Sequence, residues 1–195
     1  MTIKTLYTSF TFKLLLGILA FISMFMIAMV FGAADVTIKD VWFALTSSIT
    51  SDHISIIRDI RLPREIAAIF VGAALSISGA IMQGITRNPL ADPGLLGLSA
   101  GAYAALAVTI AFFPSANYFL TTVVCFIGAA IGALFVFGIG SMKKSRFSPL
   151  HIVLAGAAVS TFLYAIAEGI GLYFKISKDI SMWTAGGMIG TNWKQ

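Results

Sequence analysis

The sequence predicts an all-α integral membrane protein, and its composition, block lengths and residue periodicity all support this fold class. Hydrophobic residues make up 58% of the chain and charged residues 11%, against roughly 45–50% and about 25% in soluble domains. The mean hydropathy is +0.95. The apolar residues form blocks as long as a membrane-spanning helix, which needs about 17–25 residues. Because these blocks lack the period-two alternation of barrel strands, we expect helices.

Five apolar blocks are long enough to cross a bilayer, and Glu168 is the one formally charged residue within them. We expect one transmembrane helix from each block, all within a single transmembrane domain over residues 1–195. The blocks are 14–31, 66–85, 95–113, 119–140 and 150–174.

The first block follows a basic N-terminus that contains Lys4 and Lys13. Basic residues before an apolar stretch are also typical of a signal peptide, and "FGAAD" at 31–35 resembles a cleavage site. However, the apolar core is longer than the usual ~7–15 residues of a signal peptide. We therefore predict a retained first helix with a cytoplasmic N-terminus.

Loop charges are the remaining guide to orientation. With the N-terminus inside, six of the 13 Lys and Arg residues lie on the cytoplasmic side, so the positive-inside rule is a tie by simple counting. The cluster Lys143, Lys144 and Arg146 favours the inside, whereas "RDIRLPR" at 58–64 places three arginines outside. These outer arginines predict an acidic partner. Since the basic residues are scattered among loops, no nucleic-acid binding is expected.

The second block ends in the polar stretch "QGITRNPLADPG", residues 83–94. A proline disfavours helix at the residue before it and cannot donate a backbone hydrogen bond. Asn88 and Pro89 should therefore end the helix, and the turn at 92–94 should lead into the next one. We expect a shaped cytoplasmic turn beside a pathway.

Small residues four positions apart recur in the second, third and fourth blocks. This spacing lets helix backbones approach closely. We therefore predict a dense helix bundle. The pairs are Gly72 and Ser76, Ala80 and Gly84, Gly97 and Gly101, and Gly128 and Gly132.

Polar residues within the blocks are candidates for function. An intramembrane carboxylate such as Glu168 is by default a proton relay or an ion ligand, but it can equally bond a neighbouring helix. Ser76 and Gln83 are expected to form hydrogen bonds between helices. The similarity of "VGAALS" at 71–76 to "AGAAVS" at 155–160 also leaves an internal duplication open.

Enzyme signatures are weak. "GLSAG" at 97–101 matches the nucleophile elbow, but Ser99 lies in an apolar helical block and the histidines are His53 and His151. No HExxH, CxxC or Walker-A pattern occurs. We therefore expect no catalytic residues, no metal-binding residues and no cofactor. A membrane-embedded enzyme would need Ser99 or His151 to be essential.

One long segment carries a family resemblance. "RLPREIAAIFVGAALSISGAIMQGITRNPLADPGLLGLSAGA", residues 61–102, closely resembles the signature region of FecCD-type permeases, the membrane subunits of bacterial ABC importers for iron–siderophores, haem and cobalamin. The later segments "LAGAAVSTFLYAI" at 154–166 and "MWTAGGMIGTNWKQ" at 182–195 are similar to family segments as well. The resemblance covers about 59–195, and the first helix fits in placement only.

The resemblance implies a bacterial cell-membrane permease subunit with ten helices and both termini in the cytoplasm. It also implies a second permease subunit, two cytoplasmic ATPase subunits and an extracytoplasmic substrate-binding protein as partners. Arg61 and Arg64 would meet glutamates of that binding protein. Asn88 and Pro89 would lie near a cytoplasmic gate, which Ser148 would approach from the next inner loop.

Family permeases are considerably longer, and their ATPase-coupling motif, G-x-x-x-F-x-G-L-x-x-P-H, does not occur here. We therefore expect a fragment or split gene product with five of ten helices. The expected function is part of the translocation pathway of an ATP-driven iron–siderophore importer. A cobalamin or haem permease remains an alternative, as does an ion-coupled secondary transporter that uses Glu168.

Overall fold

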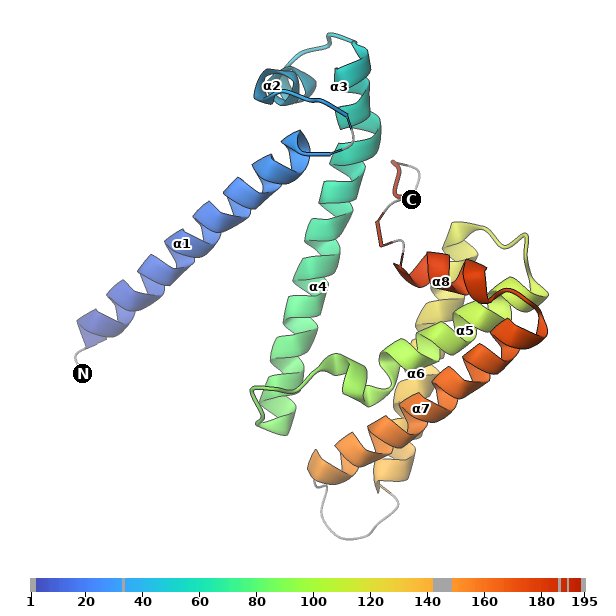
Figure 1. The fold of residues 1–195 in the computed structure, drawn as a ribbon. Helices are drawn as coiled ribbons and strands as arrows, with labels where there is room; N and C mark the ends of the chain where they lie inside the picture. The colour runs from blue at the N-terminus through green and yellow to red at the C-terminus, as the bar shows by residue number, and fades with distance from the viewer. Residues whose placement is uncertain (1–2, 33, 142–148, 186, 189, 194–195) are drawn as a thin grey trace. The chain divides into compact units, whose positions relative to one another are not determined.

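The structure is a computed structural model that describes residues 3–32, 34–141, 149–185, 187–188 and 190–193. These residues form helices joined by turns, and no strand occurs among them. The chain divides into two compact units (Figure 1). Unit 1 comprises Met1–Phe70 with Met188–Lys194, and unit 2 comprises Val71–Gly187 with Gln195. One long helix passes from the first unit into the second.

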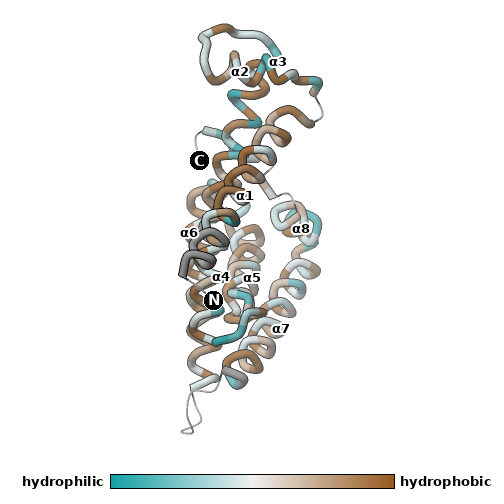
Figure 2. The backbone as a smooth tube through the Cα atoms, turned by 90° about the vertical axis from the view of Figure 1, so that its left-hand side faces the viewer, coloured by the Kyte–Doolittle hydropathy of each residue, from teal (hydrophilic) through white to brown (hydrophobic). Residues whose placement is uncertain are grey.

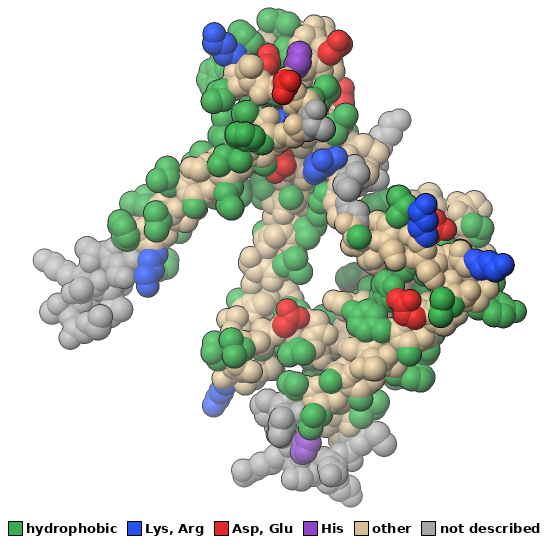
Figure 3. Space-filling view, in the orientation of Figure 1, with side chains coloured by type: hydrophobic (Ala, Val, Ile, Leu, Met, Phe, Trp, Pro, Cys, Tyr) green, Lys and Arg blue, Asp and Glu red, His purple; other side chains and the backbone are tan. Residues whose placement is uncertain are grey.

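Unit 1 begins with a long apolar helix, which is followed by short ones. The elements are α1 (Ile3–Val30), α2 (Ile38–Thr46), α3 (Asp52–Ile56), the π-helical turn η1 (Ile57–Arg61) and the first part of α4 (Leu62–Thr86). Figure 2 shows hydrophobic colouring along α1. In Figure 3 charged side chains gather over α2 and α3.

The arginine-rich stretch 58–64 is helical and does not form the loop that the sequence predicts. α3, η1 and α4 follow one another without a break, so that one apolar helical run covers Asp52–Thr86. Pro63 is the second residue of α4, a position where its missing N–H is tolerated. The π-helical turn directly before Pro63 also departs from the regular i→i−4 hydrogen-bond pattern of an α-helix. The helix therefore begins well before residue 66, the expected start.

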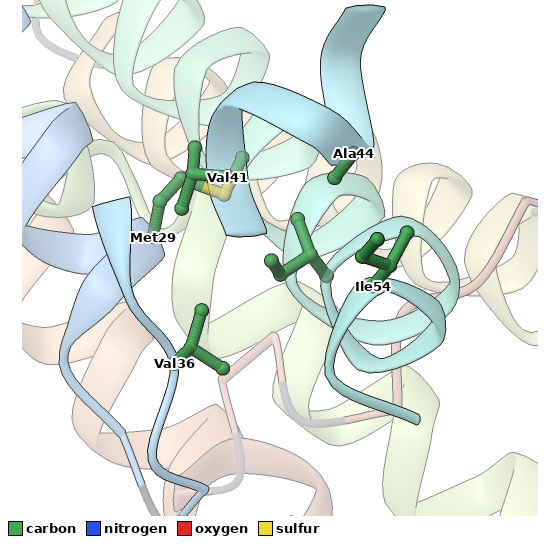
Figure 4. Packing of buried hydrophobic residues seen from close by; sticks show 6 residues of the cluster. Met29, Val36, Val41, Ala44 and Ile54 are labelled. Carbon is green, nitrogen blue, oxygen red and sulfur yellow. The ribbon is translucent and has the colours of Figure 1, made fainter. Parts of the chain in front are cut away.

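A small hydrophobic core holds the short helices of unit 1 to the last turn of α1. Met29 and Ile57 are fully buried, and Val41 of α2 packs in the same cluster. Figure 4 labels Met29 of α1, Val41 and Ala44 of α2 and Ile54 of α3 in this cluster. The complete cluster is Met29, Val36, Val41, Ala44, Ile54 and Ile57.

Unit 2 is a bundle in which α5, α6 and α7 pack against one another. After the end of α4 its elements are η2 (Pro93–Leu96), α5 (Leu98–Phe112), α6 (Tyr118–Ser141), α7 (Pro149–Tyr173) and α8 (Ser177–Ala185). Leu106, Ala107, Ala167 and Ile180 form one buried cluster, which includes a residue of α8. Val136, Ala155 and Val159 form a second cluster between α6 and α7.

The expected third membrane span, residues 95–113, is not one helix. The 3₁₀ turn η2 ends at Gly97, which has a φ of 76°, and α5 then contains 15 residues. This length is below the ~17 residues that cross a bilayer at right angles. Four helical runs in the described part of the chain are long and apolar enough to span: Phe10–Val30, Asp52–Thr86, Tyr118–Ser141 and His151–Tyr173.

The long helices also expose large apolar side chains. On α6, Phe126 is 76% and Leu134 is 70% exposed. A water-soluble chain does not normally present such continuous apolar surface. Together with the helix lengths, this exposure identifies a multi-pass membrane protein.

Candidate functional site

Arg61 is buried, with 8% of its surface exposed, and it binds the C-terminal end of α1. Its Nη1 donates to the carbonyl oxygens of Met29 at 2.6 Å and Val30 at 2.8 Å, and its Nη2 donates to that of Ala34 at 2.7 Å. The last carbonyls of a helix lack partners within the helix, and a cation there is favourable. Arg61 therefore caps α1 across 27 or more residues of sequence.

Arg58 caps the C-terminal end of α2 in the same way. Its Nε donates to the carbonyl oxygen of Ala44 at 2.9 Å, and its Nη2 donates to those of Phe43 and Ser47. Its own carbonyl oxygen accepts from Nε1 of Trp193 at 2.7 Å, so that Trp193 is hydrogen-bonded to η1. Arg58 was not among the residues expected to have a function. The spacing of Arg58 and Arg61 places both on adjacent turns of one helical run, but nothing in the sequence identifies the distant carbonyls that they bind.

Arg64, the other expected docking residue, lies one turn beyond Arg61 on α4 and is half-buried. Arg61 and Arg64 are thus neighbours on one helical run, but the guanidinium of Arg61 is directed into unit 1. The three nearby arginines are not equivalent.

The expected gate residues lie in a tight turn after α4. The helix ends at Thr86, and Arg87 adopts a φ of 49°. Oδ1 of Asn88 accepts from the backbone N–H of Leu90 at 3.0 Å, which is a side-chain-stabilised turn. Asn88 and Pro89 are both exposed. Ser148 lies outside the described residues.

The turn then leads into η2 through Asp92. Its Oδ1 accepts from the backbone N–H of Gly94 at 2.5 Å and caps the 3₁₀ turn. This arrangement matches the expectation that Asn88–Pro89 ends one helix and that residues 92–94 begin the next element.

Glycines form the contact between α5 and α6. A Cβ atom on Gly101 would overlap the carbonyl oxygen of Gly128, and one on Gly132 would overlap that of Gly97. A Cβ atom on Gly156 of α7 would likewise overlap the carbonyl oxygen of Leu95. The predicted close approach is confirmed for the pairs 97/101 and 128/132.

The small residues of α4 have a different environment. A Cβ atom on Gly72 or on Gly84 would have no atom within 4 Å. Ser76 Oγ donates within its own helix, to the carbonyl oxygen of Gly72 at 2.8 Å. Gln83 is exposed.

Glu168 on α7 is hydrogen-bonded to α5. Its Oε1 accepts from the hydroxyl of Tyr103 at 2.7 Å, and the ring of Tyr103 lies 5.4 Å from that of Tyr164. An open cavity of about 470 Å³ adjoins these rings. Ser99 and Cys125 are among the residues that line it. The interhelical role that the sequence analysis allowed for Glu168 is thus present in the geometry.

Comparison with known proteins places this arrangement in a transport family. A sequence model described as the FecCD transport family matches residues 18–195. The iron(3+)-hydroxamate import system permease protein FhuB of Bacillus subtilis (strain 168) is 43% identical over 163 residues, which cover 83% of this chain and 42% of FhuB. The ferric enterobactin transport system permease protein FepD of Escherichia coli (strain K12) is 35% identical, with 83% and 49% covered. The chain thus spans less than half the length of these relatives.

A solved structure supports the fold. It belongs to a protein described as a metal-chelate type ABC transporter in an inward-facing conformation, and it superposes with a TM-score of 0.72 and 23% identity. The superposition covers 93% of this chain and 56% of the other. The extent of the family match, the membrane helices and the signature segment 61–102 together lead to one conclusion: the chain belongs to the FecCD transport family.

Proposed function

We propose that the chain forms part of the translocation pathway of an ATP-driven importer for ferric siderophore complexes. The observation that carries this proposal is the similarity to FhuB and FepD, whose names specify iron(3+)-hydroxamate and ferric enterobactin. The chain acts as a non-enzymatic permease subunit in the bacterial cell membrane, with its N-terminus in the cytoplasm.

The partners follow from the same assignment. A second permease subunit completes the pathway, two cytoplasmic ATPase subunits supply the energy, and an extracytoplasmic binding protein delivers the cargo. The helices α5–α7, which we assign to the pathway wall, are rich in Gly, Ala and Ser and poor in charge. Such a wall offers few strong ligands, which suits release of a bulky chelate in an alternating-access cycle.

Docking of the binding protein involves Arg61 and Arg64 in different ways. Arg64 contacts acidic groups of the binding protein, and such charge pairs set register and association rate. Arg61 acts as a positioning residue, because its guanidinium already has three internal acceptors. At the other end of α4, Asn88 and Pro89 form the gate turn.

The test is transport by the full-length protein, reconstituted in vesicles with its ATPase and binding protein. Radiolabelled ferric hydroxamate uptake is measured with ATP, with a hydrolysis-deficient ATPase variant and with a protonophore. We expect uptake that requires ATP hydrolysis and survives the protonophore. Uptake that survives without ATP and stops with the protonophore would replace the proposal by an ion-coupled carrier.

The same vesicles test the cargo. Haem and cobalamin are offered in place of the ferric hydroxamate, each with a matching binding protein. ATP-dependent uptake of haem or cobalamin, without uptake of the ferric complex, would support the permease function but would reject a siderophore complex as its substrate.

A further inference from the structure

Helix α2 exposes an apolar face that the transport function does not use. Successive helical residues are about 100° apart around the axis. Ile38, Trp42 and Leu45 therefore share one face, and they are 66%, 66% and 54% exposed. Val41 and Ala44 occupy the adjoining side of the helix and are buried in the core of unit 1. The packing of α2 thus leaves Ile38, Trp42 and Leu45 mostly exposed in the described part of unit 1.

The position of α2 brings this face to the membrane boundary. α1 is a membrane-spanning candidate that ends at Val30, and α2 begins at Ile38. Met29 of α1 packs in one cluster with Val41 of α2. The guanidinium of Arg61 holds the carbonyl end of α1 in the same unit. Since α2 is fixed to the last turn of a membrane helix, it cannot move far from the bilayer surface.

The side chains of α2 match the chemistry of that boundary. Tryptophan is enriched where a bilayer meets water, and lysine can bury its stem while its ammonium reaches headgroup phosphates. Trp42 is flanked around the helix by the exposed Lys39. Charged side chains otherwise gather over the α2–α3 region on the surface seen in Figure 3. A helix with separate apolar and polar sides is typical of interfacial segments.

Protein groups bond several of the backbone groups at the two ends of α2. At the N-terminus, Thr37 Oγ1 accepts from the backbone N–H of Asp40 at 3.3 Å, and Asp40 Oδ2 accepts from that of Thr37 at 2.9 Å. At the C-terminus, Arg58 binds the carbonyl oxygens of Phe43 and Ala44. Unbonded backbone groups are costly near hydrocarbon, and here protein groups bond several of them.

We infer that α2 is an interfacial helix whose Ile38, Trp42 and Leu45 insert into the lipid surface at the end of α1. The occupant of this face is lipid, and the helix anchors the α2–α3 region at a defined depth. The inference depends on the membrane location of the chain and not on its cargo, so it stands or falls separately from siderophore transport.

The test measures the depth of α2 in the full-length protein. Nitroxide labels are attached to single cysteines at positions 38, 42 and 45, in a background without other cysteines that includes Cys125→Ala. The protein is reconstituted in vesicles of phosphatidylethanolamine and phosphatidylglycerol. Collisions with oxygen, which concentrates in the bilayer, are compared with collisions with a water-soluble nickel chelate. Position 27 on α1 serves as the lipid reference and position 53 as the water reference.

We expect the three labels on the apolar face to behave like position 27, with an oxygen-to-nickel ratio several-fold higher than at position 53. The matched label at position 39 should be intermediate or water-like. Nickel accessibility at 38, 42 and 45 equal to that at 53 would overturn the inference. Labels shielded from both reagents would also overturn it, because protein would then cover the face.

A second measurement needs no variant. The unaltered protein is illuminated in vesicles that contain a phospholipid with a photoreactive diazirine near its headgroup. Peptides are then examined by mass spectrometry. Adducts on 38–45 and none on 47–53 are expected. Equal labelling of both segments, or none on 38–45, would contradict the interfacial placement.

Discussion

The two units join their helices by opposite means. In unit 2, α5 and α6 meet through glycines, so that backbone lies directly against backbone. In unit 1, two long arginine side chains reach the carbonyl ends of α1 and α2. The glycine contact depends on the absence of side chains and tolerates no added atom. The arginine contact depends on charge and hydrogen bonds. A substitution should therefore fail for different reasons in the two units.

The largest expected effect is that of an added side chain in the glycine contact. Gly101→Leu places atoms where the Gly128 carbonyl lies, and overpacking against rigid backbone costs about 3 kcal/mol or more. Gly72→Leu is the matched control, because nothing lies within 4 Å of its Cβ position. Unfolding in mixed detergent micelles would compare the two. Similar losses of stability in both variants would remove the distinction between packed and open glycines.

A somewhat smaller effect is expected for Arg61→Met. It leaves the carbonyls of Met29, Val30 and Ala34 without their donor, and unsatisfied buried groups cost about 1–3 kcal/mol. We expect a lower midpoint of thermal unfolding for the purified protein. Arg64→Met is the comparison, and it should mainly weaken binding-protein affinity. If Arg61→Met lowered that affinity at unchanged stability, Arg61 would be a docking contact and not a cap.

The hydrogen bond between Tyr103 and Glu168 should contribute less. Hydrogen bonds between membrane helices average about 0.6 kcal/mol in double-mutant cycles. Tyr103→Phe, Glu168→Met and the double variant would measure this coupling through unfolding, because methionine offers no oxygen to the tyrosine hydroxyl. Uptake would be recorded in parallel for Glu168→Gln, which keeps the acceptor and removes the charge. Near-additive stability losses would show that the pair does not join α5 to α7. Loss of uptake in Glu168→Gln at normal stability would favour an ion-coupling role.

The smallest effect concerns pH. The Thr37 hydroxyl, followed by the Thr37 backbone N–H, holds the pKa of Asp40 below its ordinary value of 3.8. Because the folded pKa is depressed, the stabilisation of α2 is present above the unfolded pKa and is lost as pH falls through the folded pKa. The protection factors of the α2 amides, which are exchange rates corrected for the intrinsic effect of pH, should therefore fall on acidification below the ordinary value. Asp40→Asn should remove this dependence; an unchanged acid response in that variant would assign it to another group.

The two units also differ in how much of their structure could be predicted from the sequence. The proline turn after α4 was predictable, because proline restricts its own neighbours through local sterics. The glycine spacing predicted close approach, but the same spacing lies against backbone in α5 and α6 and in open space along α4. A spacing describes one helix surface, whereas its partner is chosen by the rest of the fold.

The short helices and the arginine caps were not predictable in this way. α2 has nine residues, too few for a membrane block, and the stretch 58–64 was expected as a loop. The direction of Arg61 depends on carbonyls about thirty residues away, and the partner of Glu168 lies 65 residues away. Single-sequence patterns carry no information on such pairings.

The amino-acid sequence by itself determined the membrane class of this protein, the approximate positions of the four long apolar helices that the structure describes and its family. Hydrocarbon forces the backbone to bond locally, so length and apolarity alone define those helices. Only the tertiary structure decided which glycines touch, how the third apolar block divides at Gly97, and why Arg61 is buried. Each of these outcomes depends on contacts between residues that are far apart in the sequence. The free energy of such a contact is gained only when the separate segments pack together.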